Sequence, residues 1–344
     1  MGMQDHRNAK KNFQRALSLL QDDEHIKERI QLVDIFEEDD RMGFRLHQLS
    51  VGRHICEKRA FFAPIQNLIW DYALQMKNYI YIIEHKASKE CLVVDACWDI
   101  DGIIKYTDRF GLKIVGAIVT HHHIDHVGGI PPPPYDQYRI RVDGLAKLLR
   151  KLPTIKAYVN PSDIPQVTQA NPELKAERLI ETSDDAILFL PMSKNESSSD
   201  SNSNSKSGRL QLAAADTGST ATSEPHPEYI SIKFIHTPGH TMGSQCVLLN
   251  QTRLLSGDTL FIGTCGRVDF SDSSVEKMYD SLFNKLTKLP PSTVVWPGHS
   301  YGGSFTTIEA ETANGILSPK SKDEFMDQFC KAHARKHSPN DMSL

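Results

Sequence analysis

The sequence lacks long hydrophobic runs, a strong excess of charge of either sign and closely spaced cysteines. No apolar run approaches the roughly 20 residues that span a bilayer, so we expect no membrane-spanning helix and no membrane partner. The 39 Lys and Arg against 43 Asp and Glu give a formal net charge of −4, which disfavours a nucleic-acid partner. The six cysteines form no Cys-x-x-Cys pair, which is typical of reduced, mostly buried thiols in an intracellular protein.

The amino-terminal residues have some features of a targeting signal. Arg7, Lys10, Lys11 and Arg15 accompany apolar residues at helical spacing, as in a mitochondrial transit peptide. The acidic residues that follow from Asp22 argue against this interpretation. We therefore expect a cytoplasmic protein, with mitochondrial import as the alternative.

The chain divides by composition into three parts. Residues 1–42 are charged and helix-prone, which predicts a helical N-terminal extension. Residues 43–315 alternate short β-rich runs with helical patterns, which predicts the main domain. Inside it, residues 194–227 are dominated by Ser, Asn, Asp, Thr and Gly, and a segment so poor in large apolar residues predicts a disordered insertion. Residues 316–344 predict a C-terminal helical tail.

The most informative segment is Thr120-His121-His122-His123-Ile124-Asp125-His126. It follows the apolar run 112–119, whose β-branched residues and abrupt polar end predict a buried strand. Side chains placed where a strand gives way to a loop are held by a rigid element and stay accessible to a ligand. The spacing His-x-His-x-Asp-His suits coordination of zinc or iron by imidazole and carboxylate groups. A histidine-rich loop without a metal is the alternative explanation of this segment alone.

Three further strand-like runs end in a glycine turn that carries a His or Asp. Residues 229–235 lead into His236-Thr237-Pro238-Gly239-His240, residues 253–255 into Ser256-Gly257-Asp258, and residues 293–296 into Pro297-Gly298-His299. Glycine frees the backbone, so each side chain can turn toward a shared centre. Together with the first cluster these runs supply seven candidate metal ligands: His121, His123, Asp125, His126, His240, Asp258 and His299.

This set of residues resembles the ligand motif of the metallo-β-lactamase fold superfamily, over about residues 43–315. Within that superfamily the chain is most similar to the branch containing glyoxalase II (hydroxyacylglutathione hydrolase) and the persulfide dioxygenases. True β-lactamases of the best-known subclasses carry Cys at the position of Asp258, and flavodiiron proteins carry Glu at the position of His123. The resemblance implies an α+β fold: a two-sheet αββα sandwich with helices on both outer faces and the metal site at one edge.

The resemblance also implies two divalent metal ions, expected to be Zn²⁺, and a role for each ligand. One metal would be bound by His121, His123 and His240, the other by Asp125, His126 and His299, with Asp258 bridging them. A hydroxide shared by the two metals would attack the carbonyl of the substrate, with Asp125 and Asp258 as the catalytic residues. This predicts a glyoxalase II-like metallohydrolase whose small-molecule substrate is a thioester such as an acylglutathione.

The same residues allow other hypotheses. One Fe²⁺ held by His121, His240 and Asp258 would form the two-His-one-carboxylate triad of a persulfide dioxygenase that acts on glutathione persulfide. Ligand identity alone does not separate this alternative from the hydrolase. An RNA-acting or non-catalytic member of the superfamily is disfavoured by the acidic balance and by the complete set of ligands.

Arg267 and Tyr301 are the candidate substrate-binding residues. Arg267 follows Cys265-Gly266 where glyoxalase II has a cation for the glycine carboxylate of glutathione, and its planar fork suits a carboxylate. Tyr301 matches a glutathione-contacting tyrosine of the same family. The alternatives are an ion pair between Arg267 and Asp269, and simple packing of Tyr301. The short tail lacks the Arg-x-x-Lys clamp of two-domain glyoxalase II, so the glutathione interpretation rests on these two residues.

Four other residues near these motifs have weaker assignments. Asp95 matches an acidic residue that supports the metal loop in the family, and its alternative is an ordinary strand-end acid. We do not expect His122, His236 or His54 to bind a metal.

Overall fold

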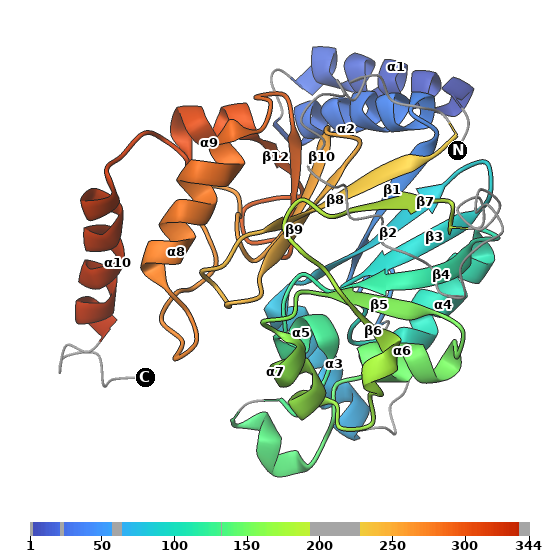
Figure 1. Ribbon diagram of the computed structural model, residues 1–344. Helices are drawn as coiled ribbons and strands as arrows, with labels where there is room; N and C mark the ends of the chain where they lie inside the picture. Colours follow the sequence, from blue (N-terminus) through green and yellow to red (C-terminus); the bar gives the residue numbers. More distant parts are fainter. Residues whose placement is uncertain (1–2, 21–23, 57–63, 132, 193–227, 337–344) are drawn as a thin grey trace, which may run out of the picture.

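The structure is a computed structural model that describes residues 3–20, 24–56, 64–131, 133–192 and 228–336. Two six-stranded sheets lie face to face with helices on both outer faces, so the predicted α+β sandwich is confirmed (Figure 1). The expected disordered insertion at residues 194–227 lies outside the described residues.

The first sheet has the strand order β1-β2-β3-β4-β5-β6. Its strands are β1 Phe44–Ser50, β2 Tyr79–His85, β3 Glu90–Val94, β4 Lys113–Ile118, β5 Lys156–Val159 and β6 Leu179–Glu181. The first three strands pair antiparallel, whereas β3 to β6 pair in parallel and need crossover connections between them. Every residue of β2 is buried, because both faces of this sheet are covered.

The second sheet has the strand order β12-β11-β10-β9-β8-β7. Its strands are β7 Ile187–Leu190, β8 Ile230–His236, β9 Gln245–Leu249, β10 Arg253–Gly257, β11 Val294–Pro297 and β12 Thr306–Thr307. β10 and β11 pair in parallel, while the other neighbours pair antiparallel. As a result β8, β10 and β11 run in the same direction, and their carboxyl ends lie at one edge.

Each sheet carries its own layer of helices. The first sheet is covered by α3 Pro64–Met76, α4 Ile100–Arg109, α6 Leu145–Lys151 and α7 Ile164–Ala170, with the single turn α5 Ile124–Val127 and the 3-10 turns η1 Tyr135–Tyr138 and η2 Ala176–Arg178 nearby. The second is covered by α8 Val275–Tyr279, η4 Asp280–Lys285, η5 Leu286–Lys288, α9 Ile308–Asn314 and α10 Lys322–Lys336.

The helical segment that begins after Ser274 changes type along its length. Ser274 caps its start by accepting a hydrogen bond from the Lys277 amide. The helix then widens to π geometry over η4 and tightens to 3-10 geometry over η5. Met278, Leu282 and Leu286 are all fully buried and four residues apart, and a widened turn keeps such a series on one face.

Three apolar layers hold the sandwich together. The central layer joins the inner faces of the two sheets, for example Ile83 and Leu92 with Phe234 and Leu255. The two outer layers lie between each sheet and its helices. Three apolar layers between four layers of secondary structure are what an αββα sandwich requires.

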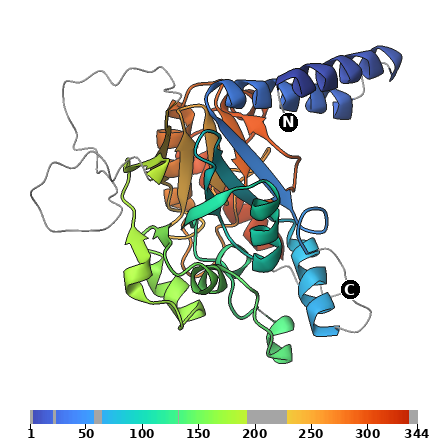
Figure 2. The same cartoon turned by 90° about the vertical axis from the view of Figure 1, so that its right-hand side faces the viewer.

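The N-terminal residues form α1 Met3–Leu20 and α2 Glu24–Arg41, which pack against each other across one end of the sandwich (Figure 2). Arg253 on β10 is 1% exposed, and its guanidinium donates to Asp39 and Glu38 of α2, at 2.8 Å in each case. A buried charge pair therefore ties α2 to the second sheet. The division into an extension at 1–42, a main domain at 43–315 and a tail at 316–344 remains a proposal.

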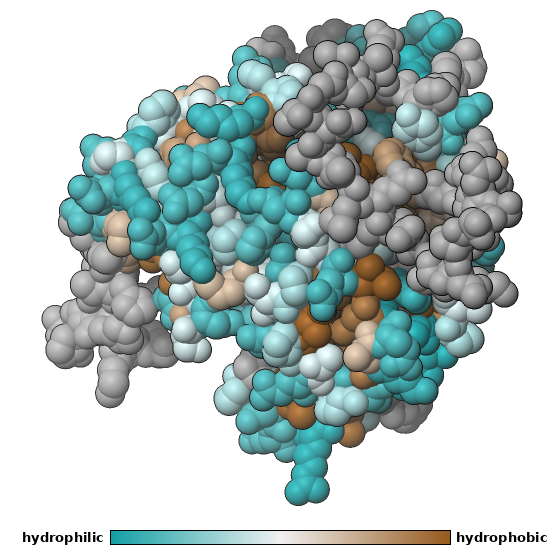
Figure 3. Space-filling view, viewed as in Figure 1, coloured by the Kyte–Doolittle hydropathy of each residue, from teal (hydrophilic) through white to brown (hydrophobic). Residues whose placement is uncertain are grey.

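The surface seen in the orientation of Figure 1 is largely hydrophilic, and hydrophobic residues gather in its lower middle (Figure 3). Within the described part of the chain, every helix is too short or too polar to cross a membrane.

Candidate metal centre

Four strand ends from the two sheets meet at one edge of the sandwich. His121 follows β4 of the first sheet, while His240, Asp258 and His299 follow β8, β10 and β11 of the second. The seven candidate ligands gather there into three overlapping groups of close donor atoms, among the residues that the structure describes. The first group is His121, His123 and His240, the second is Asp125, His126 and His299, and the third, which shares members with both, is His121, His126 and Asp258.

The first group consists of three imidazoles. His123 Nδ1 lies 2.9 Å from His240 Nε2, and the His121 ring is perpendicular to both neighbours within about 15°. His121 Nε2 is buried and has no hydrogen-bond partner among the residues that the structure describes. Such an orphaned acceptor atom is costly unless something positive binds to it, so this observation fits a metal ion.

The second group is a nearly equilateral triangle of donor atoms. His126 Nε2 and His299 Nε2 are 3.3 Å apart, and each lies 3.5 Å from Asp125 Oδ2. Ligand atoms around a tetrahedral zinc at about 2.0–2.1 Å lie roughly 3.3–3.4 Å from one another. The spacing of this triangle therefore suits a zinc-sized ion.

Asp258 reaches both groups. Its Oδ2 lies 3.4 Å from His240 Nε2 and 3.3 Å from His299 Nε2, and its Oδ1 lies 3.4 Å from His126 Nε2. One carboxylate thus contacts a member of each group, which is the position that the resemblance assigns to a bridging ligand.

The electrostatics of the centre differ between the two groups. Burial, followed by the charge of neighbouring imidazoles, lowers the pKa of His121 and lowers that of His123 to about 3, so both are neutral and able to donate a lone pair. Burial also disfavours a proton on His126, but Asp125, Asp258 and Asp95 outweigh it and raise its pKa to about 10. The carboxylates therefore attract positive charge to the second group, where a metal ion would replace a proton.

Three of the imidazole rings are held in orientation by a hydrogen bond from the ring nitrogen that faces away from the donor groups. His126 Nδ1 donates to Asp95 Oδ2 at 2.8 Å, His240 Nδ1 to the Arg267 carbonyl at 2.7 Å, and His299 Nδ1 to the Met76 carbonyl at 2.6 Å. Such contacts set the tautomer and orientation of a ligating histidine. Asp95 also accepts from the amide and hydroxyl of Thr120, so it contacts both ends of the ligand loop and is more than an ordinary strand-end acid.

Sequence reasoning missed Asp163, which joins the two loops of the first group. Its carboxylate is 1% exposed and accepts from the His122 amide at 2.9 Å, the Gly243 amide at 2.7 Å and the Thr241 hydroxyl at 2.9 Å. Its place four residues after β5 repeats the strand-end pattern, which was the available signal. Asn78, described below, was also missed.

Arg267 and Tyr301, the candidate substrate-binding residues, make the contacts that the sequence offered as alternatives to substrate binding. Arg267 forms a forked ion pair with Asp269 at 2.8 and 2.9 Å, and its guanidinium lies 4.5 Å from the centre of the Phe270 ring. Tyr301 stacks on His299, with ring centroids 4.7 Å apart and an interplanar angle of 7°. Both side chains remain more than half exposed beside the centre, at 62% and 52%.

The histidines not expected to bind a metal lie outside these groups in the described part of the chain. His122 faces Asp163 and Asp272 at 3.2 and 3.3 Å, and His236 Nε2 contacts the Met242 carbonyl at 2.9 Å. His54 Nδ1 accepts from the Ser50 amide at 3.0 Å.

Gly298-His299-Ser300-Tyr301-Gly302 has the Gly-x-Ser-x-Gly spacing of a serine-hydrolase nucleophile elbow. An elbow requires a strand, a sharp turn and a helix, whereas here β11 is followed by a loop and the short strand β12. The ring nitrogens of His299 are directed to Met76 and to Asp125 and Asp258. The match is therefore a coincidence of spacing.

Comparison with known proteins supports this assignment of the fold. The metallo-beta-lactamase superfamily model matches residues 76–132 and 214–299. This chain is 25% identical to the "Probable polyketide biosynthesis zinc-dependent hydrolase PksB" of Bacillus subtilis (strain 168). The match extends over 227 residues, which are 66% of this chain and 75% of that protein. Over 224 residues, 65% of the chain, it is 26% identical to the "Hydroxyacylglutathione hydrolase" of Vibrio cholerae serotype O1 (strain ATCC 39541 / Classical Ogawa 395 / O395), 62% of which is covered.

Solved structures show the same fold. ETHE1 from Myxococcus xanthus superposes with a TM-score of 0.52 at 20% identity, covering 77% of this chain and 89% of that one. A metallo-beta-lactamase from Staphylococcus aureus superposes with a TM-score of 0.53 at 19% identity, covering 87% of this chain and 68% of that one. The chain belongs to the metallo-β-lactamase superfamily, and its relatives support the branch that contains glyoxalase II and the persulfide dioxygenases.

Proposed function

We propose that this protein is a metallohydrolase that cleaves a thioester, such as an acylglutathione, at a centre of two zinc ions. The observation that carries the proposal is the pair of donor groups joined by Asp258, each with three donor atoms within 4.8 Å of one another. The first metal would be held by His121, His123 and His240, the second by Asp125, His126 and His299, and Asp258 would contact both.

Metals bound at this site would supply a lowered pKa for water and polarisation of a carbonyl oxygen. The chain's own residues supply charge and orientation. Burial alone would raise the pKa of Asp258 and of Asp125, but neighbouring histidines outweigh it and hold both below their usual range. Both carboxylates therefore stay ionised at neutral pH, ready to bind cations and to accept a hydrogen bond from water.

The proposed recognition of glutathione rests on two exposed residues beside the centre. Arg267 presents a guanidinium to solvent while Asp269 holds it from one side, so a substrate carboxylate can approach the exposed part of the fork. Tyr301 lies against His299 and also contacts the edge of Phe261. The relatives named hydroxyacylglutathione hydrolase agree with this substrate class.

A persulfide dioxygenase with one iron ion is the alternative. It would use His121, His240 and Asp258, and the last two are 3.4 Å apart. It would leave the triangle of Asp125, His126 and His299 without a metal, and the spacing of these donor atoms, which suits a zinc-sized ion, is the reason we favour the hydrolase.

The test is hydrolysis of S-lactoylglutathione by the full chain loaded with zinc. The loss of the thioester absorbance measures the rate of hydrolysis. We expect turnover by the wild type and none by His121→Ala. His54→Ala is the matched control, because His54 lies outside the donor groups, and it should keep full activity. Turnover retained by folded His121→Ala would overturn the proposal.

A further inference from the structure

Asn78 lies against the second donor group and is held there by its backbone. It is 2% exposed and directly precedes β2 of the first sheet. The amide of Tyr79 donates to the Gly298 carbonyl at 2.8 Å, and the amide of Ser300 donates to the Lys77 carbonyl at 2.9 Å. The residues flanking Asn78 are therefore bonded to the residues flanking His299, which joins the two sheets at this edge.

The side-chain amide of Asn78 contacts all three members of the second group. Its Nδ2 lies 3.0 Å from Asp125 Oδ2, 3.3 Å from His126 Nε2 and 3.5 Å from His299 Nε2. These are the same three atoms that form the triangle described above. The amide nitrogen is therefore a fourth vertex, nearly equidistant from the three proposed ligand atoms.

Trp98 determines which end of the amide faces the triangle. Its indole Nε1 lies 3.0 Å from Asn78 Oδ1, and an indole N–H can only donate. The amide oxygen must therefore face Trp98, and the NH₂ group must face the proposed ligands. Asn78 then donates to Asp125 Oδ2, and Asp125 is the acceptor-only member of the triangle.

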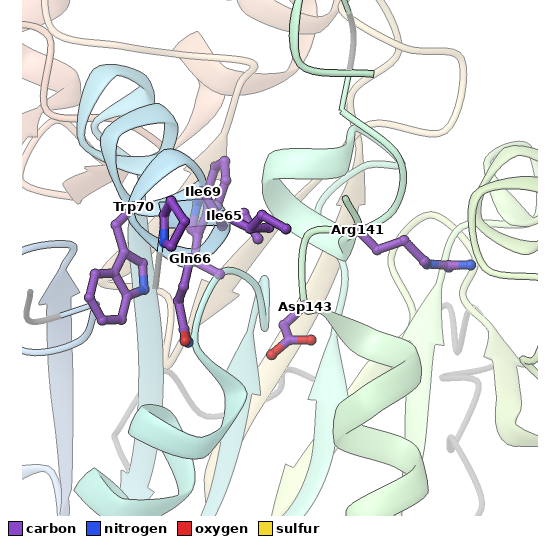
Figure 4. Close-up of a pocket in the computed structure, with 8 residues that line it drawn as sticks. Ile65, Gln66, Ile69, Trp70, Arg141 and Asp143 are labelled. Carbon is purple, nitrogen blue, oxygen red and sulfur yellow. The ribbon is translucent and has the colours of Figure 1, made fainter. Parts of the chain in front are cut away.

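Trp98 itself is held from the other side. Its ring meets the Tyr72 ring edge-on with centroids 5.4 Å apart, and its backbone amide donates to the Asp143 carbonyl at 2.8 Å. It also lines a pocket of about 420 Å³ together with Trp70, Ile65 and Asp143 (Figure 4). The indole is thus fixed by packing and backbone contacts, and the orientation of the Asn78 amide follows from it.

We propose that Asn78, oriented by Trp98, is the positioning residue of the second metal subsite: its N–H group holds the Asp125 carboxylate in the ligating orientation. This inference rests on the proposed dinuclear centre and goes beyond it, because it concerns a residue that does not itself bind the metal. Partners that orient a ligand in this way commonly change metal affinity by about 10–100-fold.

The experiment is a calorimetric titration of metal-free full-length protein with Zn²⁺, repeated with Co²⁺ so that visible absorption reports the coordination of each ion. The wild type should take up two ions. In Asn78→Ala the first ion should bind as in the wild type, while the second binds 10–100-fold more weakly and its cobalt spectrum changes. Trp98→Phe keeps both Asn78 and Asp125 but frees the amide, so it should weaken the second ion by a smaller factor.

Asn171→Ala is the matched control, since Asn171 is an equally buried amide whose Nδ2 donates to the Gly128 and Val167 carbonyls. It should leave the ratio of the two affinities unchanged. Wild-type affinity for both ions in Asn78→Ala, or an equal loss at both subsites, would overturn the assignment of Asn78. A wild-type chain that takes up no second ion would instead overturn the dinuclear centre itself, so the two failures are distinguishable.

Discussion

Asp95 and His126 form a buried hydrogen bond of 2.8 Å that joins the end of β3 to the metal loop after β4. Because Asp95 sets the orientation of the His126 ring, Asp95→Ala should lower the affinity for the second zinc about 10–100-fold. Asp95→Asn, which keeps the shape but not the charge, should have a smaller effect. Competition with a chromophoric chelator measures both, and unchanged affinity in Asp95→Ala would show that His126 needs no such support.

Arg267 should act on substrate binding and not on the metals. Arg267→Ala removes the cation proposed to meet the glycine carboxylate, so KM for S-lactoylglutathione should rise by about tenfold, the equivalent of one charged hydrogen bond. Metal content should not change. A thioester of N-acetylcysteamine, which has no carboxylate, provides the control substrate. An equal loss with both thioesters would mean that Arg267 serves only its ion pair with Asp269.

Asp163 should contribute both to the free energy of unfolding and to the affinity for the first metal. Asp163→Ala leaves the buried amides of His122 and Gly243 without their acceptor, so we expect a loss of about 2–4 kcal/mol in the free energy of unfolding. Urea unfolding of the metal-free protein measures this loss without any contribution from metal. The first zinc should also bind more weakly, because the loops of His123 and His240 lose their link. A variant as stable as the wild type would exclude this role.

Glu84, which lies away from the metal centre, should make the free energy of unfolding depend on pH. Burial alone would raise the pKa of this carboxyl, but hydrogen bonds from His47 and Lys89 outweigh it and lower the pKa from 4.5 to about 2. A depressed pKa stabilises the folded state at pH values above the unfolded pKa, by about 3 kcal/mol here, and this contribution is lost as the pH falls from 4.5 toward 2.

Chemical unfolding of the wild type and of Glu84→Gln between pH 7 and pH 3 checks this expectation. The wild type should be the more stable protein at pH 7, and the difference should shrink steadily below pH 4.5. A difference that stays constant over the whole range would mean that the charge of Glu84 contributes nothing.

The parts of the fold that local sequence determines were predictable. The run 112–119 contains β4, as its β-branched pattern predicts, and α4 is capped by Asp99, a residue type that marks helix starts in sequences. The candidate ligands were also predictable, because each lies in the loop or turn that follows a strand. The change of helix type after Tyr279 was not predictable, because the spacing of the buried Leu282 and Leu286 also fits an ordinary α-helix.

Residues that act over long sequence distances were harder to find. Asn78 is 221 residues from His299 and belongs to no ligand motif, so only the pairing of the two sheets reveals their contact. The role of Arg267 was hard to predict for a different reason. The sequence offered both Asp269 and a substrate carboxylate as partners, and in the structure the guanidinium contacts Asp269 while most of its surface stays open.

The most direct test of the central claim is a stepwise zinc titration of the metal-free protein, with S-lactoylglutathione hydrolysis measured at each step. The proposed centre predicts that hydrolysis rises with added zinc and reaches its plateau at two ions per chain. Absence of hydrolysis at every zinc content, together with oxygen uptake by the one-iron protein supplied with glutathione persulfide, would contradict it.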